Sequence, residues 1–363
     1  MMNIHSIKHI FSLFLFSVLA FDVHAQKPRN IILMIGDGMG QEQVHALSLL
    51  RNDSTVNMKT FPYSGISKTY SLNDSITDSA AGGSALSTGK KTCNGYLAFN
   101  QDSTANETLF EEARRYGKAT GFVVSCPMTH ATPASFYAHV DSRNKSEEIA
   151  RQLLHAQLDF AVGGQYNHFN SRKDGQNLLD SLKNSGYQVV YSVTDLQQLV
   201  SGKAMAILSE RKPGDVNVRG DWMRRGLRKA LELLSQNKNG FVLMVEGSQI
   251  DWACHANSFS HFAEEIIEFD DLVGMAKAFA EADGETLVVV TADHETGGMK
   301  VLPQADKKRE KAVKKVRKYV KFTRVIHSGV PVNVFAFGPG AEHFQGIMEN
   351  TAIHDEISRL MQP

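Results

Sequence analysis

Short apolar runs alternate with amphipathic stretches through most of the chain, from Asn30 to Gly338. The runs are continuous and rich in β-branched residues, which is typical of strands buried on both faces of a sheet. They cover residues 30–36, 121–126, 159–164, 187–192, 204–208, 240–247, 286–294 and 331–338. The stretches between them place apolar residues at helical spacing over 41–50, 107–117, 146–157, 224–234 and 261–282. This alternation predicts a three-layer α/β/α sandwich with a mostly parallel central sheet.

The composition is that of an ordinary globular protein with balanced charge. The chain has 363 residues, of which 42% are hydrophobic and 21% charged. Lys plus Arg and Asp plus Glu both number 39, so the overall charge favours neither a specific nucleic-acid partner nor a membrane surface. No internal repeat or linker is visible, so we expect residues 26–363 to form one domain with a short basic insert near 300–325. The three cysteines allow at most one disulfide.

The N-terminal segment has the pattern of a secretory signal peptide. A weakly basic start at Lys8 precedes an apolar run from Ile10 to Phe21, and small residues end at Ala25. The competing interpretation is a membrane anchor, but the run is shorter than the roughly 20 residues that a spanning helix needs. We therefore expect residues 1–25 to be removed and the mature chain to be periplasmic or secreted, without a stable membrane anchor.

The segment 307–321 is strongly basic. Val313, Val316 and Val320 recur there at helical spacing, which predicts a solvated basic helix with a narrow apolar stripe. The alternative is a role in steering anionic substrates, because the segment lies between two candidate ligand groups in the sequence.

Acidic residues follow three of the predicted strands. Asp37, Glu246 and the pair Asp293 and His294 each stand just past an apolar run. Ligands of such sheets gather at the carboxyl ends of the strands. These side chains are therefore expected to converge on one site.

Ser79 lies in the stretch TDSAAGGSALSTG, residues 77–89, which has the small residues of a tightly packed helix start. The first turn of a helix offers free N–H groups and a partial positive field, which suit a nucleophile or a bound phosphate. The alternative is that Asp78 or Ser79 simply caps the helix.

Asp251 and His255 stand four residues apart and would share one face of a helix, a spacing that suits two ligands of one metal. A capping pair or a simple hydrogen bond is the alternative. The wider set contains carboxylates and imidazoles without thiolates, which suits catalytic zinc. Its members are Asp37, Asp251, His255, Asp293, His294 and His327.

Three further residues complete the candidate chemistry. Glu246 and the hydroxyl of Thr132 are hard oxygen ligands of the kind that magnesium prefers. Arg143 offers a guanidinium fork that can hold two phosphate oxygens. Two metals beside a serine would form a clamp for in-line phosphoryl transfer.

Six segments together resemble the motif series of alkaline phosphatases, in the same order and over nearly the whole chain from about 30 to 340. They are 36–40, 77–95, 130–143, 245–257, 291–298 and the region of His327. Several long motifs in register are far more specific than one short pattern. The resemblance implies an alkaline-phosphatase-like fold.

The resemblance also implies a role for each candidate residue. Ser79 would be the nucleophile and Arg143 the phosphate clamp. One Zn²⁺ would be held by Asp251, His255 and His327, and a second by Asp37, Asp293 and His294 with Ser79 as its reactive ligand. The third site, usually Mg²⁺, would use Asp37, Thr132 and Glu246.

This sequence departs from the best-known bacterial pattern at two positions. His130 stands where many bacterial members have aspartate, and as a ligand it would change the metal preference of the third site. Trp252 stands at the expected substrate-binding edge, where a lysine or histidine is common, and supplies no cation to phosphate. The stretch between His294 and His327 is also short, which suggests a compact member with an open site. The family's homodimer is a further expectation.

The predicted function is hydrolysis of phosphate monoesters through a covalent phosphoserine, with release of inorganic phosphate. Serine at position 79, rather than cysteine or threonine, favours monoester over sulfate or diester chemistry. The alternatives are a phosphodiesterase or phosphotransferase of the same superfamily, and an inactive metal-dependent binding protein.

Overall fold

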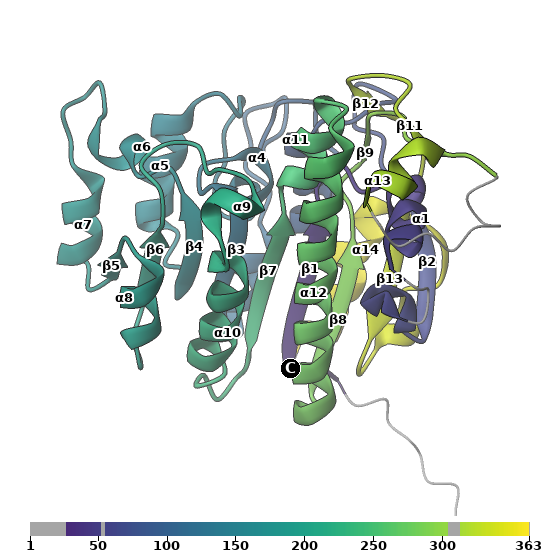
Figure 1. The fold of residues 1–363 in the computed structure, drawn as a ribbon. Helices are drawn as coiled ribbons and strands as arrows, with labels where there is room; N and C mark the ends of the chain where they lie inside the picture. The colour runs from purple at the N-terminus through teal and green to yellow at the C-terminus, as the bar shows by residue number, and fades with distance from the viewer. Residues whose placement is uncertain (1–26, 52–54, 304–312, 363) are drawn as a thin grey trace, which may run out of the picture.

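A ten-stranded sheet forms the centre of the computed structural model, which describes residues 27–51, 55–303 and 313–362 (Figure 1). The signal-peptide prediction falls on residues outside these ranges. In spatial order the strands are β14 (Gly346–Glu349), β2 (Tyr63–Lys68), β13 (Val332–Phe337), β8 (Thr286–Thr291), β1 (Asn30–Gly36), β7 (Phe241–Gly247), β3 (Ala119–Pro127), β4 (Phe160–Gly164), β6 (Ala204–Ile207) and β5 (Gln188–Val190).

The predicted mostly parallel sheet is confirmed. Among the described strands of this sheet, β13 is the one that runs antiparallel to its neighbours, β8 and β2. The central strand β1 pairs in parallel with β7 on one side and β8 on the other. Strands β2 and β14 were not predicted, because each is short, half exposed and without a continuous apolar run.

Helices cover both faces of the sheet (Figure 1). One face packs against α1 (Gln41–Leu50), α10 (Trp222–Leu234) and α12 (Phe259–Asp283). The other packs against α2 (Ser79–Thr88), α3 (Leu109–Arg115), α5 (Ser146–His155), α7 (Leu178–Asn184) and α14 (Asn350–Met361). On β1, Ile32 joins the first core and Ile31 the second, both fully buried. Burial of such a side chain contributes about 1.5–3 kcal/mol, so both faces of the apolar runs stabilise the fold.

The remaining described elements are short. They are α4 (Ala131–Ala134), α6 (Asn167–Asn170), α8 (Val193–Gln198), α9 (Val216–Arg219), α11 (Gln249–His255), β9 (Glu295–Thr296), β10 (Lys300–Val301), α13 (Val313–Val316), β11 (Val320–Lys321), β12 (His327–Ser328) and 3₁₀ turns at Asn57–Thr60, Arg317–Tyr319 and Ala341–His343.

The prediction of a continuous basic helix over 307–321 is wrong for its described part, residues 313–321. A single α-helical turn, α13, is followed by a 3₁₀ turn, and the chain then extends into β11. Val320 pairs with Val301 of β10 and is buried, as is Val316. Val316 and Val320 therefore anchor this segment to the core, and local helical spacing is overridden by the antiparallel pairing of β11 with β10.

Helix α12 is long, with 25 residues, but carries buried acids that pair with arginines of other segments. Glu265 forms a bidentate pair with Arg219 at 2.9 and 2.5 Å, and Asp270 lies 3.2 Å from Arg51. Such charges belong in a protein interior only when they are paired. No helix within the described ranges is long and apolar enough to cross a membrane.

Candidate active site

The carboxyl edge of the three central strands carries the candidate acids. Asp37 directly follows β1, Glu246 lies at the end of β7, and Asp293 and His294 follow β8. Because β8, β1 and β7 are neighbours in the sheet, their ends meet, and the structure brings these four side chains together. Asp37, Glu246 and His294 are fully buried, and Asp293 is 1% exposed.

The first cluster contains Asp251, His255 and His327, whose ligand atoms lie within 4.8 Å of one another. Helix α11 places Asp251 and His255 on one face, and their Oδ1 and Nε2 atoms are 3.3 Å apart. His327 comes from β12, which pairs with β9 just after His294, and its Nε2 lies 3.5 Å from the same carboxylate oxygen.

Backbone carbonyls fix how the two histidines of this cluster are oriented. His255 Nδ1 lies 2.6 Å from the carbonyl of Val325, and His327 Nδ1 lies 2.9 Å from that of Thr77. A carbonyl only accepts, so each Nδ1 carries the donated proton and each Nε2 is left with a lone pair. The two Nε2 atoms nevertheless face each other at 3.1 Å. Two lone pairs at this distance would repel, so the cluster needs positive charge there, either a metal ion beside both nitrogens or protons on Nε2 that are donated to Asp251.

The first cluster combines an ionised carboxylate with two imidazoles, a charge pattern that suits a metal site. Burial raises the pKa of Asp251, but hydrogen bonds from His255 and His327 outweigh it and hold that pKa well below its ordinary value. The hydrogen bond to Asp251 raises the pKa of His255. The carboxylate is therefore ionised, and it attracts either protons or a metal to the adjoining imidazoles.

The second cluster contains Asp37, Asp293 and His294 beside Ser79. His294 Nε2 lies 3.2 Å from Asp293, 3.6 Å from Asp37 and 3.2 Å from the Ser79 hydroxyl. Thr296 donates its hydroxyl to Asp251 and lies 3.3 Å from His294 Nδ1, which makes Nδ1 the donor and leaves Nε2 as a lone pair.

Buried oxygens of the second cluster lack partners. Among the residues that the structure describes, neither carboxylate oxygen of Asp37 has a hydrogen-bond partner, and the same is true of Asp293 Oδ2. Burial and the charge of Asp293 raise the pKa of Asp37 well above its ordinary value, and burial with the charge of Asp251 raises the pKa of Asp293 to about 6. Unpaired carboxylates are costly in an interior, so these donors fit a bound cation.

Ser79 begins α2, and the cap of that helix is Asp78, which accepts from the N–H of Ala81 at 3.0 Å. The Ser79 hydroxyl is thus free of the capping role and faces His294. Gly82 lets the helix approach, because a Cβ there would lie 3.0 Å from the carbonyl oxygen of Asp293. Arg143 lies 3.0 Å from Asp78, which orients its guanidinium toward the same helix start.

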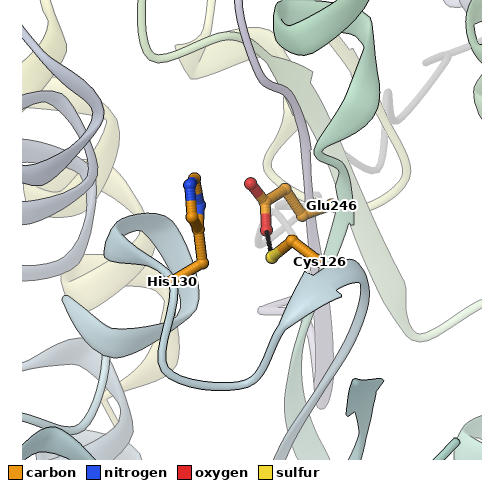
Figure 2. A group of neighbouring side chains, drawn as sticks. All are labelled: Cys126, His130 and Glu246. Atoms are coloured by element: carbon orange, nitrogen blue, oxygen red, sulfur yellow. Dashed lines mark hydrogen bonds between the residues drawn. The ribbon is translucent and has the colours of Figure 1, made fainter. Parts of the chain in front are cut away.

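A third group lies beside these clusters, where His130 precedes α4, Thr132 lies within it and Glu246 is the penultimate residue of β7. His130 Nδ1, Thr132 Oγ1 and Glu246 Oε1 are buried atoms that have no hydrogen-bond partner in the described part of the chain. Burial raises the pKa of Glu246 to about 8, and burial together with the charge of Arg143 lowers the pKa of His130 to about 3. Figure 2 shows His130 and Glu246 pointing toward one another, with Cys126 beside them. Sequence reasoning had assigned no role to Cys126.

Trp252 of α11 forms one edge of the site, with its ring 5.7 Å from that of His130 in an edge-on arrangement. The ring supplies no charge itself, but the ammonium of Lys212 lies 3.4 Å from its centroid. Lys212 was missed because it lies in a loop with no motif of its own. Pro213, the residue after it, is buried, and the carbonyl of Gly214 accepts from Gln249 at 2.8 Å, so the loop is anchored.

The fold and the ligand clusters define a three-layer α/β/α protein with candidate metal ligands gathered at the carboxyl edge of its sheet. The family profile described as alkaline phosphatase matches residues 28–317. Alkaline phosphatase 4 of Bacillus subtilis is 31% identical over 92% of this chain and 89% of its own length, and Escherichia coli alkaline phosphatase is 30% identical over 91% and 85%.

Solved structures agree with these relatives. The alkaline phosphatase of the Antarctic bacterium TAB5 superposes with a TM-score of 0.85 and 38% identity, covering 93% of this chain and 99% of that one. Two mutants of that enzyme, in which one histidine is replaced by aspartate or glutamate, have Mg bound in the M3 site. The present chain belongs to the alkaline phosphatase family. It is a phosphoric monoester hydrolase.

Proposed function

We propose that Ser79 is the nucleophile of this phosphomonoesterase and that a phosphoserine forms during each cycle. The observation that carries this proposal is the Ser79 hydroxyl at the start of α2, 3.2 Å from His294 and inside the second cluster. Ser79 Oγ attacks phosphorus, the P–O bond to the leaving alcohol breaks, and the alcohol departs with a proton. Water then hydrolyses the phosphoserine, which regenerates the serine and releases inorganic phosphate.

The residues fit two zinc ions and a third ion. Asp251, His255 and His327 would hold one zinc, and Asp37, Asp293 and His294 the second. The third ion would lie among Asp37, His130, Thr132 and Glu246. The unpartnered carboxylate oxygens and the facing lone pairs support this assignment. When bound, the ions favour the serine alkoxide and polarise the leaving oxygen.

Two cationic side chains of this chain would bind the phosphate. Arg143, held by Asp78 at 3.0 Å, presents its remaining N–H groups to the equatorial oxygens. Lys212, held on the face of Trp252, adds positive charge at the edge of the site. The expected substrates are therefore small phosphate monoesters.

The test of the nucleophile uses Ser79→Ala with Ser87→Ala, in the same helix, as the control. Ser79→Ala should lose turnover by on the order of 10³-fold or more and form no acid-stable phosphoenzyme, while its metal content stays unchanged. Ser87→Ala should keep both. Full activity in the Ser79 variant would contradict the assignment.

Two other functions make different predictions. A diesterase or phosphotransferase of the same superfamily would prefer a diester or an acceptor alcohol, which a comparison of rates on matched mono- and diesters decides. A silent binding protein would release no phosphate from an aryl phosphate in the presence of zinc and magnesium. The complete ligand set argues against the second alternative.

We also propose that the chain is exported after removal of residues 1–25. The apolar run and the small residues before Ala25 support this. N-terminal sequencing of the mature protein should begin near Gln26, and a retained Met1 would contradict it.

A further inference from the structure

Cys126 lies against the third group of ligands. It stands near the carboxyl end of β3, which pairs in parallel with β7, the strand whose penultimate residue is Glu246. Its side chain is fully buried, and its sulfur lies 3.5 Å from Glu246 Oε2 and 3.3 Å from the carbonyl of Pro127. Figure 2 shows the thiol and the imidazole of His130 on two sides of the Glu246 carboxylate.

The three ligand atoms of Cys126, His130 and Glu246 all lie within 4.8 Å of one another. Zinc bonds of about 2.0–2.3 Å place the ligand atoms of one ion roughly 3.5 Å apart, so shifts of about 1 Å close the site. The sulfur and the carboxylate oxygen already have this separation. Two atoms of the cluster, His130 Nδ1 and Glu246 Oε1, are buried without a hydrogen-bond partner within the described ranges, which is a second and independent sign of a missing ligand.

We propose that Cys126 is a ligand of the third site and that this site selects a thiophilic divalent ion, zinc or cobalt, over magnesium. The proposal rests on the function proposed above. A thiolate and an imidazole are soft and borderline donors that favour zinc and cobalt, whereas magnesium demands an octahedral shell of oxygens. The thiol proton leaves to solvent when the sulfur binds the ion. Both other cysteines lie outside this cluster, and all three are free and buried.

Cobalt is the direct probe, because a thiolate bound to Co²⁺ gives a sulfur-to-metal charge-transfer band in the near ultraviolet. The full mature enzyme, loaded with Co²⁺ alone, should show this band. Cys126→Ala and Cys126→Ser should lose it. Cys93→Ala is the matched control, since Cys93 is also buried but accepts from Gln101 at 2.9 Å away from the cluster, and it should keep the band. Cys254 is present in every variant, so a band that survives Cys126 replacement would contradict the proposal.

Metal competition gives a second readout that does not depend on activity. With equal zinc and magnesium, the parent enzyme should retain three zinc ions per chain, and Cys126→Ser should exchange about one of them for magnesium. Equal magnesium content in both proteins would overturn the proposal. Cys126→Ser keeps nearly the same volume, and its unfolding temperature shows whether it is folded. If the enzyme forms the Ser79 phosphoenzyme but lacks the cobalt band, the role of Cys126 is refuted and the proposed function stands.

Discussion

Hydrogen bonds at the far nitrogen of each imidazole determine what this site can bind. Carbonyls hold Nδ1 of His255 and His327, and Thr296 holds Nδ1 of His294, so all three Nε2 atoms face inward as lone pairs. None of these tautomers follows from the spacing of the histidines in the sequence. The sequence motifs identify the histidines, but the partners come from residues up to 250 positions away.

Replacing His327 tests the first cluster. His327→Ala should bind about one zinc fewer per chain, because Asp251 and His255 alone leave the ion with two protein ligands. Elemental analysis of the purified protein measures this. His343→Ala, which changes an exposed histidine that pairs with Glu342 away from the site, should keep the full content. Unchanged zinc in the His327 variant would reject the ligand role.

Removing the charge of Lys212 tests whether this side chain helps to bind the phosphate of the substrate. Lys212→Met should raise KM for a phosphate monoester about two- to five-fold with little change in kcat, because an exposed charge contributes up to about 1 kcal/mol. Lys212→Arg should restore KM, since a guanidinium also stacks on Trp252. Lys203→Met is the control, since that lysine lies near the ring of Tyr187 instead. A KM that does not respond to Lys212→Met would exclude a role in binding.

At the scale of elements, continuous apolar runs allowed the main strands and the five amphipathic helices to be predicted from the sequence. The neighbouring strands β14 and β2 were missed because half-exposed strands lack that pattern. The helix prediction for the basic segment was wrong because valines at helical spacing can also reach the core from a turn and a short strand, as Val320 does in its pairing with Val301. Cys126 gave no sequence signal, because a buried cysteine in a strand is ordinary.

We expect the link between α3 and the segment after α4 to depend on pH. His139 Nε2 lies 3.1 Å from Glu111, which also closes the capping box of α3 with Thr108. Burial lowers the pKa of His139, but the hydrogen bond to Glu111 outweighs it and the net pKa is raised from 6.5. For Glu111, burial raises the pKa, but the His139 hydrogen bond and those of Thr108 outweigh it, and the net pKa is lowered from 4.5.

The sign of both shifts gives a window of stability. The contribution of Glu111 to the free energy of unfolding is present above pH 4.5 and is lost as pH falls through its lowered pKa. The contribution of His139 is complete below pH 6.5 and is lost as pH rises through its raised pKa. Glu111→Gln keeps the capping box but removes the charge. The difference in Tm between parent and variant should therefore be larger at about pH 5.5 than at about pH 8.5. A difference that is the same at both pH values would contradict the coupling.

The whole molecule has a formal net charge of zero, yet it concentrates buried acids at one edge of the sheet. Asp37, Glu246, Asp251 and Asp293 converge there with few compensating cations. Sequence composition hides this asymmetry, since it appears only when neighbouring strands bring their ends together. We therefore expect bound metal ions to stabilise the fold, because they would bind the folded state and neutralise these acids.

Chelation should lower the stability of the whole molecule, and the loss should grow with pH. In the metal-free protein, burial raises the pKa of Glu246 to about 8, so the folded state holds more protons than the unfolded chain between about pH 6.5 and 8. His255 and His327 also have raised pKa values, which act in the same direction, because their contribution is lost as pH rises. His130 and His294, with lowered pKa values, are neutral in the folded state, but the unfolded chain still binds protons there near its ordinary pKa of 6.5, so these two act in the opposite direction at the low end of this range. Their effect fades above about pH 7.5, whereas that of Glu246 continues to about pH 8.

The measurement is the Tm of the chelated and the zinc-loaded enzyme at about pH 6.5 and about pH 8.5. The chelated protein should melt lower at both values, with the larger deficit at the higher pH, and added zinc should restore it. Because the Glu111–His139 pair is present in both forms, its pH dependence cancels in the difference. A Tm deficit that becomes smaller as pH rises would contradict the idea that metal ions neutralise the buried acids.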